Sequence, residues 1–334
     1  MRALRQFLVL GRVGLAPFTA VPWFTGGAVA GAGAPALAAL VCGGLALHIV
    51  ACLVNDLADL AADRTNPARR GSPLVSGAVA QVQVAWWVLL LVTALTAGCC
   101  LLPTSRWATA GLVCVLLLTL WGNLFQKKSR RVPPPVVDHL FGLAMAATLP
   151  LAALAAGGRP SVAVVAVAVA FALQMVVMNA TVGGLKDLDV DRAAGARTTA
   201  IVLGVRRRAP AGLTVPRPFR VYVLSAQLGS VPALAVASPA AAALAATATA
   251  ALPLALRRVA AGERTGSPLR RVGFVLGNAA AFLVGCAALL RDRPAAAAAL
   301  LVVVAALAGT AARRRARARS VDDGAAALHQ HPQG

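Results

Sequence analysis

Apolar stretches of about 20 residues follow one another along most of this chain, and each is long enough to cross a bilayer as a helix. Hydrophobic residues make up 59% of the 334 residues and charged residues only 13%, far from the composition of a soluble globular domain. The stretches are continuous and lack the alternating pattern of membrane-spanning strands. We therefore predict an all-α, polytopic transmembrane helical bundle. Ten windows qualify as spans: residues 13–32, 36–56, 84–102, 107–125, 136–156, 161–183, 219–237, 240–256, 272–290 and 295–311.

The basic residues predict the orientation of this bundle. The connections on one side hold only four of the 32 basic residues, and the termini and the remaining connections hold the others. Cytoplasmic loops carry the excess of Lys and Arg, so we expect an even number of spans and both termini in the cytoplasm. We also expect a plasma-membrane location. The four residues on the sparse side are Arg106, Arg159, Arg291 and Arg293.

This distribution also bears on partners and domains. A net charge of +21 would suit nucleic acid, but charges segregated by membrane side indicate topology and attraction to anionic lipid instead. We expect the lipid bilayer as a partner and no nucleic acid. Residues 1–312 are predicted to form one transmembrane domain, and residues 313–334 a basic, disordered cytoplasmic tail.

The acidic residues are few and concentrated. Of the eleven, six lie in two short clusters, each at the end of an even-numbered span, so the predicted topology puts both on the cytoplasmic side. Ionisable groups at membrane depth are rare and indicate a functional site. The alternative is a pair of polar helix ends that only mark the membrane boundary. The cluster members are Asp56, Asp59 and Asp63, then Asp187, Asp189 and Asp191.

Spacing within the clusters indicates a bound cation. If the second span continues as a helix, Asn55, Asp59 and Asp63 share one face, and Asp187 and Asp191 likewise lie four residues apart. Like charges at this spacing repel unless a cation lies between them. Paired oxygen ligands suit Mg²⁺, which is commonly shared with substrate phosphates.

Both clusters with their flanking residues resemble the two signatures of the UbiA superfamily of intramembrane prenyltransferases. The first is "NDLADLAADRTNPARRGSPLVSG" and the second is "GGLKDLDVDRAAGARTTAIVLG". The resemblance implies a nine-helix core, to which this chain adds a predicted tenth span. It implies transfer of a prenyl group from an isoprenyl diphosphate to a small-molecule acceptor, often a phenol or quinone precursor. The implied cofactor is Mg²⁺, held by Asn55, Asp59, Asp63, Asp187 and Asp191.

The same resemblance implies basic residues that neutralise the diphosphate. Lys186 and Arg197 lie inside the second signature and are the strongest candidates, also for a catalytic role. Arg64 and Arg192 follow an aspartate and could orient carboxylates instead. Each of these basic residues could instead serve only to set the orientation of the chain in the membrane. The further candidates for binding the diphosphate are Arg69, Arg70, Lys127 and Lys128.

Several residues leave the acceptor open. Aromatic-alkylating members often carry a Tyr where this chain has Gly183. Asp138 and His139 open the fifth span and could assist an acceptor hydroxyl or simply cap a helix. His48 in the second span could be a hydrogen-bonded residue of the core or a residue of the active site. Aromatic rings could stabilise an allylic cation, and no particular ring is assigned to that role.

Two other functions remain open at this point. A terpene cyclase of the same superfamily would use identical metal chemistry without an acceptor. A cation-coupled membrane transporter would also place carboxylates in the membrane, but with inverted repeats and broken helices near the midplane. The prenyl chain length and the oligomeric state are not predicted.

Overall fold

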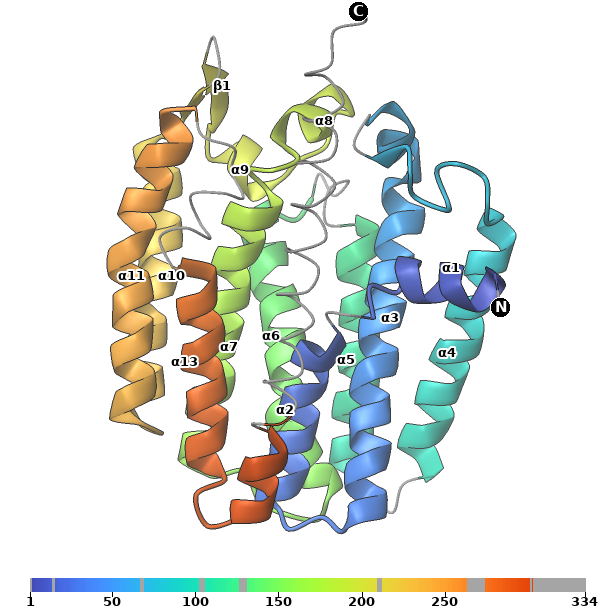
Figure 1. The fold of residues 1–334 in the computed structure, drawn as a ribbon, viewed down its shortest axis with the longest axis vertical. Coiled ribbons are helices and arrows are strands. Elements are labelled where there is room, and N and C mark those ends of the chain that lie inside the picture. The colour runs from blue at the N-terminus through green and yellow to red at the C-terminus, as the bar shows by residue number, and fades with distance from the viewer. Residues whose placement is uncertain are drawn as a thin grey trace, which may run out of the picture.

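The protein is described from a computed structural model, which covers residues 2–13, 16–66, 69–101, 106–125, 131–208, 212–262, 274–300 and 302. Long helices make up most of this part of the chain, as predicted, and they run along the long axis of the molecule (Figure 1). The long helices are α2 (Ala16–Val29), α3 (Ala34–Thr65), α4 (Gln81–Leu101), α5 (Arg106–Phe125), α6 (Pro134–Ala155), α7 (Val162–Met178), α10 (Arg217–Ala235), α11 (Pro239–Ala260) and α13 (Phe274–Leu289).

Short elements connect these helices mainly at one end of the bundle. There α7 passes into a π-helical turn, and the chain then forms two short helices and a two-stranded antiparallel hairpin before α10. One further short helix precedes α2. The short elements are α1 (Arg2–Leu10), η2 (Asn179–Gly183), α8 (Leu188–Ala193), α9 (Thr199–Val202), β1 (Arg206–Arg208) and β2 (Gly212–Thr214).

The first nine predicted windows correspond to nine long helices. The tenth window, 295–311, falls mostly outside the described residues, as do residues 313–334. Six of the described helices are long and apolar enough to cross a membrane by length and composition, and α13 is a shorter apolar helix. Two further long helices do not meet this criterion. Helix α2 has only 14 residues, and α10 carries arginines at its start.

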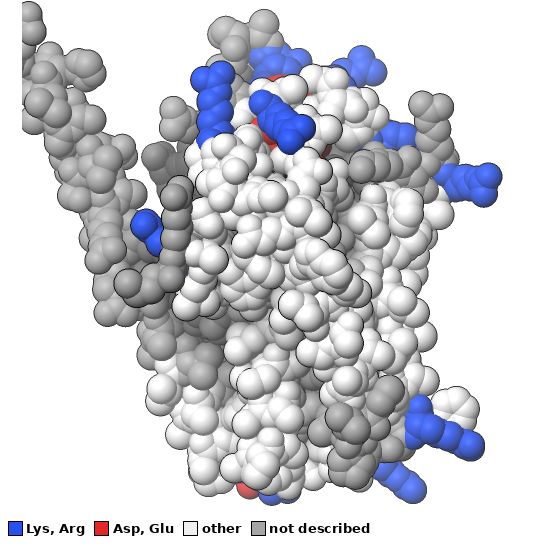
Figure 2. All heavy atoms as spheres, turned by 90° about the vertical axis from the view of Figure 1, so that its right-hand side faces the viewer, with Lys and Arg blue, Asp and Glu red and all other residues white. Residues whose placement is uncertain are grey.

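Helix packing brings segments from both halves of the chain together. Helix α2 packs against α3 and α6, α6 against α5 and α7, and α7 against α10 and α13. One face of the molecule shows no charge over its centre, and most charged side chains lie toward its two ends, apart from basic atoms at its left edge near mid-height (Figure 2). Large apolar side chains such as Trp86, Leu90 and Leu117 are exposed, which suits contact with lipid tails.

Local chemistry explains the helix starts and ends. Proline occupies the first turn of α3, α6, α10 and α11, where its missing N–H would have no helical partner. Ser161 and Ser238 accept hydrogen bonds from N–H groups of the first turn of α7 and α11. These caps reduce the number of unpaired backbone groups at helix ends.

Helix α1 is not among the predicted elements. It lies across the bundle beside α3 and α4 (Figure 1). Phe7 packs edge-on against Trp87 of α4, with 5.3 Å between ring centroids, and Gln6 Nε2 donates to the carbonyl of Ala78 at 3.2 Å. Leu4 and Val9 remain exposed. A helix of nine residues is too short to span a bilayer.

Close packing between α2 and α6 depends on one glycine. A Cβ atom built on Gly26 would lie 2.1 Å from the carbonyl oxygen of Leu149 and 2.9 Å from the Cβ of Ala152. The backbones of the two helices therefore approach each other more closely than any larger residue permits.

Replacing Gly26 with alanine should separate α2 from α6 and lower the stability by about 1–3 kcal/mol, the usual cost of overpacking. Thermal unfolding of the purified protein in detergent measures this. Gly98→Ala in α4 is the matched control, because nothing lies within 4 Å of its added Cβ. Equal melting temperatures for the two variants would contradict the close-packing argument.

Candidate active site

The first acidic cluster lies on the last turns of α3, which continues without a break to Thr65. The prediction that Asn55, Asp59 and Asp63 share one helix face is therefore confirmed. Asp56 and Asp63 are buried, whereas Asn55 and Asp59 are half-buried. A row of carboxylates at the end of an apolar helix needs positive neighbours.

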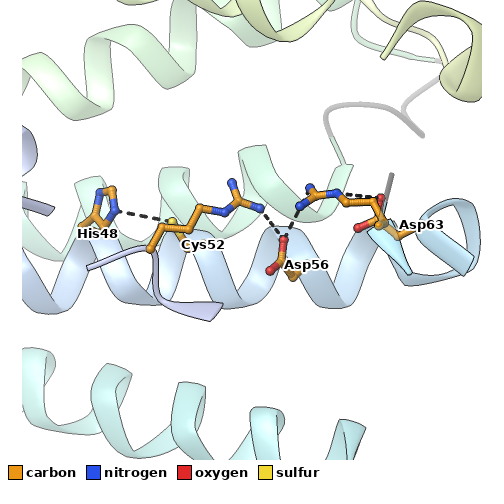
Figure 3. A network of polar contacts seen from close by, with 6 residues as sticks. His48, Cys52, Asp56 and Asp63 are labelled. Atoms are coloured by element: carbon orange, nitrogen blue, oxygen red, sulfur yellow. Dashed lines mark hydrogen bonds and ion pairs between the residues drawn. The ribbon is translucent and has the colours of Figure 1, made fainter. Parts of the chain in front are cut away.

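Two arginines supply this positive charge in the structure. Arg12 Nη2 lies 2.5 Å from Asp56 Oδ1, and Arg69 lies 3.9 Å from the same oxygen. Arg69 Nε also lies 3.4 Å from Asp63 Oδ1. Figure 3 shows Asp56 with one guanidinium group on each side along α3. Arg69, one of the predicted diphosphate-binding residues, is thus shared between two carboxylates.

Sequence reasoning missed Arg12. It follows α1 and precedes α2, far from Asp56 in the chain, and its φ of 46° lies in the left-handed region that non-glycine residues seldom adopt. The only signal in the sequence is one arginine just before the first apolar span. Because the contact depends on how α1 and α2 pack beside α3, spacing along the chain could not reveal it.

The second cluster lies on a separate short helix. Helix α7 ends, a π-helical turn and a bend follow, and Asp187 is the residue that precedes α8. Asp187 is half-buried and Asp191 is buried. Asp191 N–H donates to the carbonyl of Asp187 at 2.8 Å, so the two residues are one turn apart, as predicted. Exposed Asp189 instead pairs with Arg207 of β1.

The two clusters lie at the same end of the bundle. Helix α8 contacts α3, and Figure 1 shows α8 at the end of the molecule where α3 terminates. The expectation of a shared side is confirmed. Among the residues that the structure describes, however, no three His, Cys, Asp or Glu side chains form a group that could hold a metal ion. Coordination of a shared ion by both clusters stays a prediction.

The predicted basic residues surround the clusters unevenly. Lys186 and Arg70 are exposed, and Arg197 is half-buried. Lys127 and Lys128 lie outside the described residues. Arg192 donates from Nη2 to the carbonyl of Val205 at 2.7 Å, which ties α8 to the start of the hairpin.

Asp138 connects the segment that carries the second cluster to α6. Its Oδ1 accepts a hydrogen bond from Asn179 Nδ2 at 2.8 Å, and its Oδ2 accepts one from Thr199 Oγ1 at 2.5 Å. Asn179 begins η2 and Thr199 begins α9, so the two bonds bracket the acidic segment. The interpretation of Asp138 as a helix cap is wrong, because α6 starts after Pro133 without a side-chain cap.

His139, next to Asp138, also has a local role. Its Nδ1 lies 2.7 Å from the carbonyl oxygen of Pro135. The hydroxyl of Tyr222, on α10, donates to the same carbonyl at 3.3 Å. These contacts join the start of α6 to α10.

A cavity of about 480 Å³ lies within the bundle and reaches Asn55, the residue before Asp56. Asn55 and Arg12 line it near the acidic end, and residues of α2, α5, α6, α7 and α13 complete its wall. Its lining is mostly apolar. Four phenylalanines contribute, of which the sequence analysis named none for a site: Phe18, Phe141, Phe171 and Phe282.

The model of the UbiA prenyltransferase family matches residues 16–278, a region that includes both acidic clusters and most of the cavity lining. The chain belongs to the UbiA prenyltransferase family. With its apolar helices, it is a multi-pass membrane protein. A search of curated proteins found no significant match.

Solved UbiA structures share this fold. A UbiA homologue from Aeropyrum pernix K1, determined without ligand, is 20% identical with a TM-score of 0.60, covering 80% of this chain and 97% of its own. A digeranylgeranylglyceryl phosphate synthase is 15% identical with a TM-score of 0.61, covering 86% and 99%. An Archaeoglobus fulgidus homologue bound to GPP and Mg²⁺ is 15% identical with a TM-score of 0.58, covering 85% and 99%.

Removing either partner of the Arg12–Asp56 pair should destabilise this UbiA protein by about 1–3 kcal/mol, because the other charge is left without its partner in a largely buried position. Arg12→Met and Asp56→Asn test this by thermal unfolding in detergent. The double variant should be less destabilised than the sum of the two, because no lone charge remains. Strict additivity would show that the pair contributes no coupling.

The Asp138 contacts predict local order in the segment between Asn179 and Thr199. Thr199→Val removes the hydroxyl donor but keeps the side-chain shape, so amide hydrogen exchange across residues 185–198 should become faster. Thr199→Ser keeps the donor and is the matched control. Unchanged exchange in Thr199→Val would mean that the bond to Asp138 does not hold this segment.

Proposed function

We propose that the protein is a Mg²⁺-dependent intramembrane prenyltransferase, which transfers a prenyl group from an isoprenyl diphosphate to a small acceptor. Family membership supports this proposal. The observation that carries it is the position of the apolar cavity, which is lined at one place by Asn55, next to Asp56 on α3, and by Arg12, the partner of Asp56. An amphiphilic substrate with an anionic head and an apolar tail matches this arrangement.

The donor set fits Mg²⁺ in kind. Asp59, Asp63, Asp187 and Asp191, with the amide of Asn55, offer hard oxygen ligands on two contacting helices. Arg69 now neutralises Asp63, so a dication would compete with this arginine for the carboxylate. A bound Mg²⁺ would stabilise the negative charge that gathers on the leaving diphosphate. The homologue from Archaeoglobus fulgidus was solved with GPP or DMAPP and Mg²⁺.

Basic side chains would complete the neutralisation. We assign diphosphate contacts to Lys186, which precedes the second cluster, and to Arg197, which follows it. Arg69 and Arg70, beyond the end of α3, are assigned the same role. Lys127 and Lys128 remain candidates from the sequence. As the C1–O bond breaks, its electron pair goes to the diphosphate, and cations placed at that oxygen lower the barrier.

The cavity would protect the reactive chain. The allylic carbon must form its new bond with the acceptor, which loses a proton, before water reaches it. The phenyl rings of Phe171 and Phe282 lie stacked at 4.2 Å between centroids and line the cavity. Ring faces attract positive charge, so these side chains suit a substrate whose tail carries a transient cation.

We further propose that the end with the acidic clusters faces the cytoplasm of the plasma membrane, with both termini on that side. Arginines of the second signature, the hairpin and the start of α10 gather at this end, which agrees with the positive-inside rule. Residues 1–312 would form the transmembrane domain and residues 313–334 the cytoplasmic tail.

The two alternatives fare differently. Clusters far apart or at opposite ends of the bundle would have favoured a transporter, but α8 contacts α3 at one end. A cyclase would share the metal and the cavity, and product analysis separates it. Incubation of purified membranes with a C15 or C20 diphosphate alone would yield a hydrocarbon from a cyclase, but no prenylated product from a transferase without acceptor.

Single replacement of Asp59, Asp63, Asp187 or Asp191 by alanine should lower turnover about 100-fold or more, because charge on the leaving group loses its stabilisation. Turnover is measured as transfer of the label from radiolabelled prenyl diphosphate to each of a panel of aromatic acceptors. Asp292→Ala is the matched control, because Asp292 is exposed in a loop after α13.

Metal removal tests the same scheme independently. EDTA should abolish turnover in the wild type, and added Mg²⁺ should restore it. Wild-type rates in any two of the four alanine variants, or full activity in EDTA, would refute the assignment of these carboxylates to a metal-bound diphosphate.

A further inference from the structure

Helix α1 carries apolar side chains that the described part of the chain leaves uncovered. Phe7 and Leu10 pack into an apolar cluster with residues of α3 and α4. Leu4, Leu8 and Val9 on the same helix are exposed. The level of α1 in the membrane and the rotation of the helix decide what covers them.

The level of α1 follows from the contact between Arg12 and Asp56 of α3. From Ala34 to Asp56, α3 has no Asp, Glu, Lys or Arg before Asp56 itself, and this stretch rises about 33 Å at 1.5 Å per residue. The hydrocarbon core of a bilayer is about 30 Å thick. Asp56 and Arg12 therefore lie where the hydrocarbon ends. Helix α1 ends shortly before Arg12 and lies across the bundle, so it lies in the plane of the membrane surface (Figure 1).

Two contacts fix which side of α1 faces the hydrocarbon. Gln6 Nε2 donates to the carbonyl of Ala78, in the loop that joins the end of α3 to α4. Phe7 packs edge-on against Trp87, which lies further along α4 toward the middle of the bundle. The side of α1 with Gln6 therefore faces the membrane surface, and the side with Phe7 faces the hydrocarbon.

Helical spacing extends this division along α1. Leu4 lies three residues before Phe7 and Leu8 lies four residues after Leu4, so both leucines lie toward the apolar side. Arg5 is exposed and, two residues before Phe7, lies on nearly the opposite side of the helix. A helix that lies in the membrane plane with apolar residues on one side and a basic residue on the other is typical of an interfacial membrane helix.

The C-terminal end of α1 fixes the position of Arg12. The N–H of Arg12 donates to the carbonyl of Val9 at 3.2 Å, and the N–H of Val13 donates to the carbonyl of Leu8 at 3.3 Å. This pair of bonds closes a helix end at which the left-handed residue is usually glycine. Here it is Arg12, with a φ of 46°, and its guanidinium group contacts Asp56. Displacement of α1 would therefore move Arg12 away from Asp56.

We propose that α1 binds the surface of the lipid bilayer, with Leu4 and Leu8 among the acyl chains and Arg5 at anionic headgroups, and that this binding holds Arg12 at Asp56. The depth of α1 favours lipid over another protein chain, because acyl chains surround the bundle at this level. The charge of Arg5 favours anionic headgroups over neutral ones. The inference goes beyond the proposed prenyltransferase function and requires only that the chain spans a membrane.

Amide hydrogen exchange of the full-length protein in lipid nanodiscs tests the headgroup preference. Discs that hold one copy each are made from phosphatidylcholine alone or from an equal mixture with phosphatidylglycerol. Exchange across residues 3–13 should be about fivefold slower in the anionic discs, the effect of one basic residue near such a surface. Arg5→Gln should remove this difference. Arg159→Gln is the matched control, because Arg159 is exposed in the loop between α6 and α7 at the opposite end of the bundle.

The apolar contacts are tested by replacing Leu4 and Leu8 together with serine. Exchange across residues 3–13 should become about tenfold faster or more in both kinds of disc, because the leucines lose their contact with acyl chains. Leu117→Ser changes an exposed leucine of α5 and should leave this exchange unchanged. Exchange across residues 57–66, at the end of α3, should also become faster in the double serine variant. With Asp56→Asn already present, the serine replacements should cause no further increase there.

Each contrary outcome overturns a defined part of the proposal. Equal exchange of residues 3–13 in the two kinds of disc would overturn the anionic headgroup preference, and wild-type exchange in the double serine variant would overturn the binding to acyl chains. Slow exchange that appears only in discs with two copies would assign the exposed side of α1 to a second copy of this chain and refute lipid as its partner. Faster exchange at residues 3–13 with no change at residues 57–66 would overturn the link to Arg12.

Discussion

Neutralisation of carboxylates at the end of an apolar helix is the constraint on which the architecture of the site depends. Asp56 and Asp63 are buried, and the free energy of burying a charge is unfavourable unless an opposite charge lies close by. Arg12 and Arg69 meet this need from two different segments, one before α2 and one beyond α3. The network ties the start of the bundle to its first acidic helix. The same arginines would compete with a bound dication for these carboxylates, because Arg69 already pairs with Asp63.

A second set of buried contacts holds the other half of the site. The π-helical turn after α7 and the short helices α8 and α9 are too short to be stable alone, so they depend on tertiary contacts for order. An apolar core that they form with residues of α10 and α11 includes Ala180, Leu188 and Ala200. Asp138 bonds to residues at both ends of this segment, and Arg192 attaches α8 to the hairpin. Metal chemistry would require two clusters that are far apart in the chain to keep fixed positions. The contacts of Asp138 hold the segment of the second cluster in place, and the contacts of Arg12 and Arg69 hold the first cluster.

The cavity connects these polar contacts to the proposed chemistry. Its end at Asn55 and Arg12 adjoins the first acidic cluster, and its phenyl rings suit an apolar chain. Polar residues of α3 and α5 also line the cavity, among them His48 and Asn123.

The sequence by itself determined the helical class, the membrane location and the two acidic clusters. Continuous apolar runs allow few other folds in lipid, since every backbone N–H and C=O must be paired within its own helix. Helical spacing then placed Asn55, Asp59 and Asp63 on one face, as observed. Only the tertiary structure decided which groups meet across helices. Arg12 reaches Asp56, and Asp138 accepts from Asn179 and Thr199, in both cases through packing of segments distant in the chain. Periodicity reports the faces of one helix, and it carries no information on which faces of different helices come together.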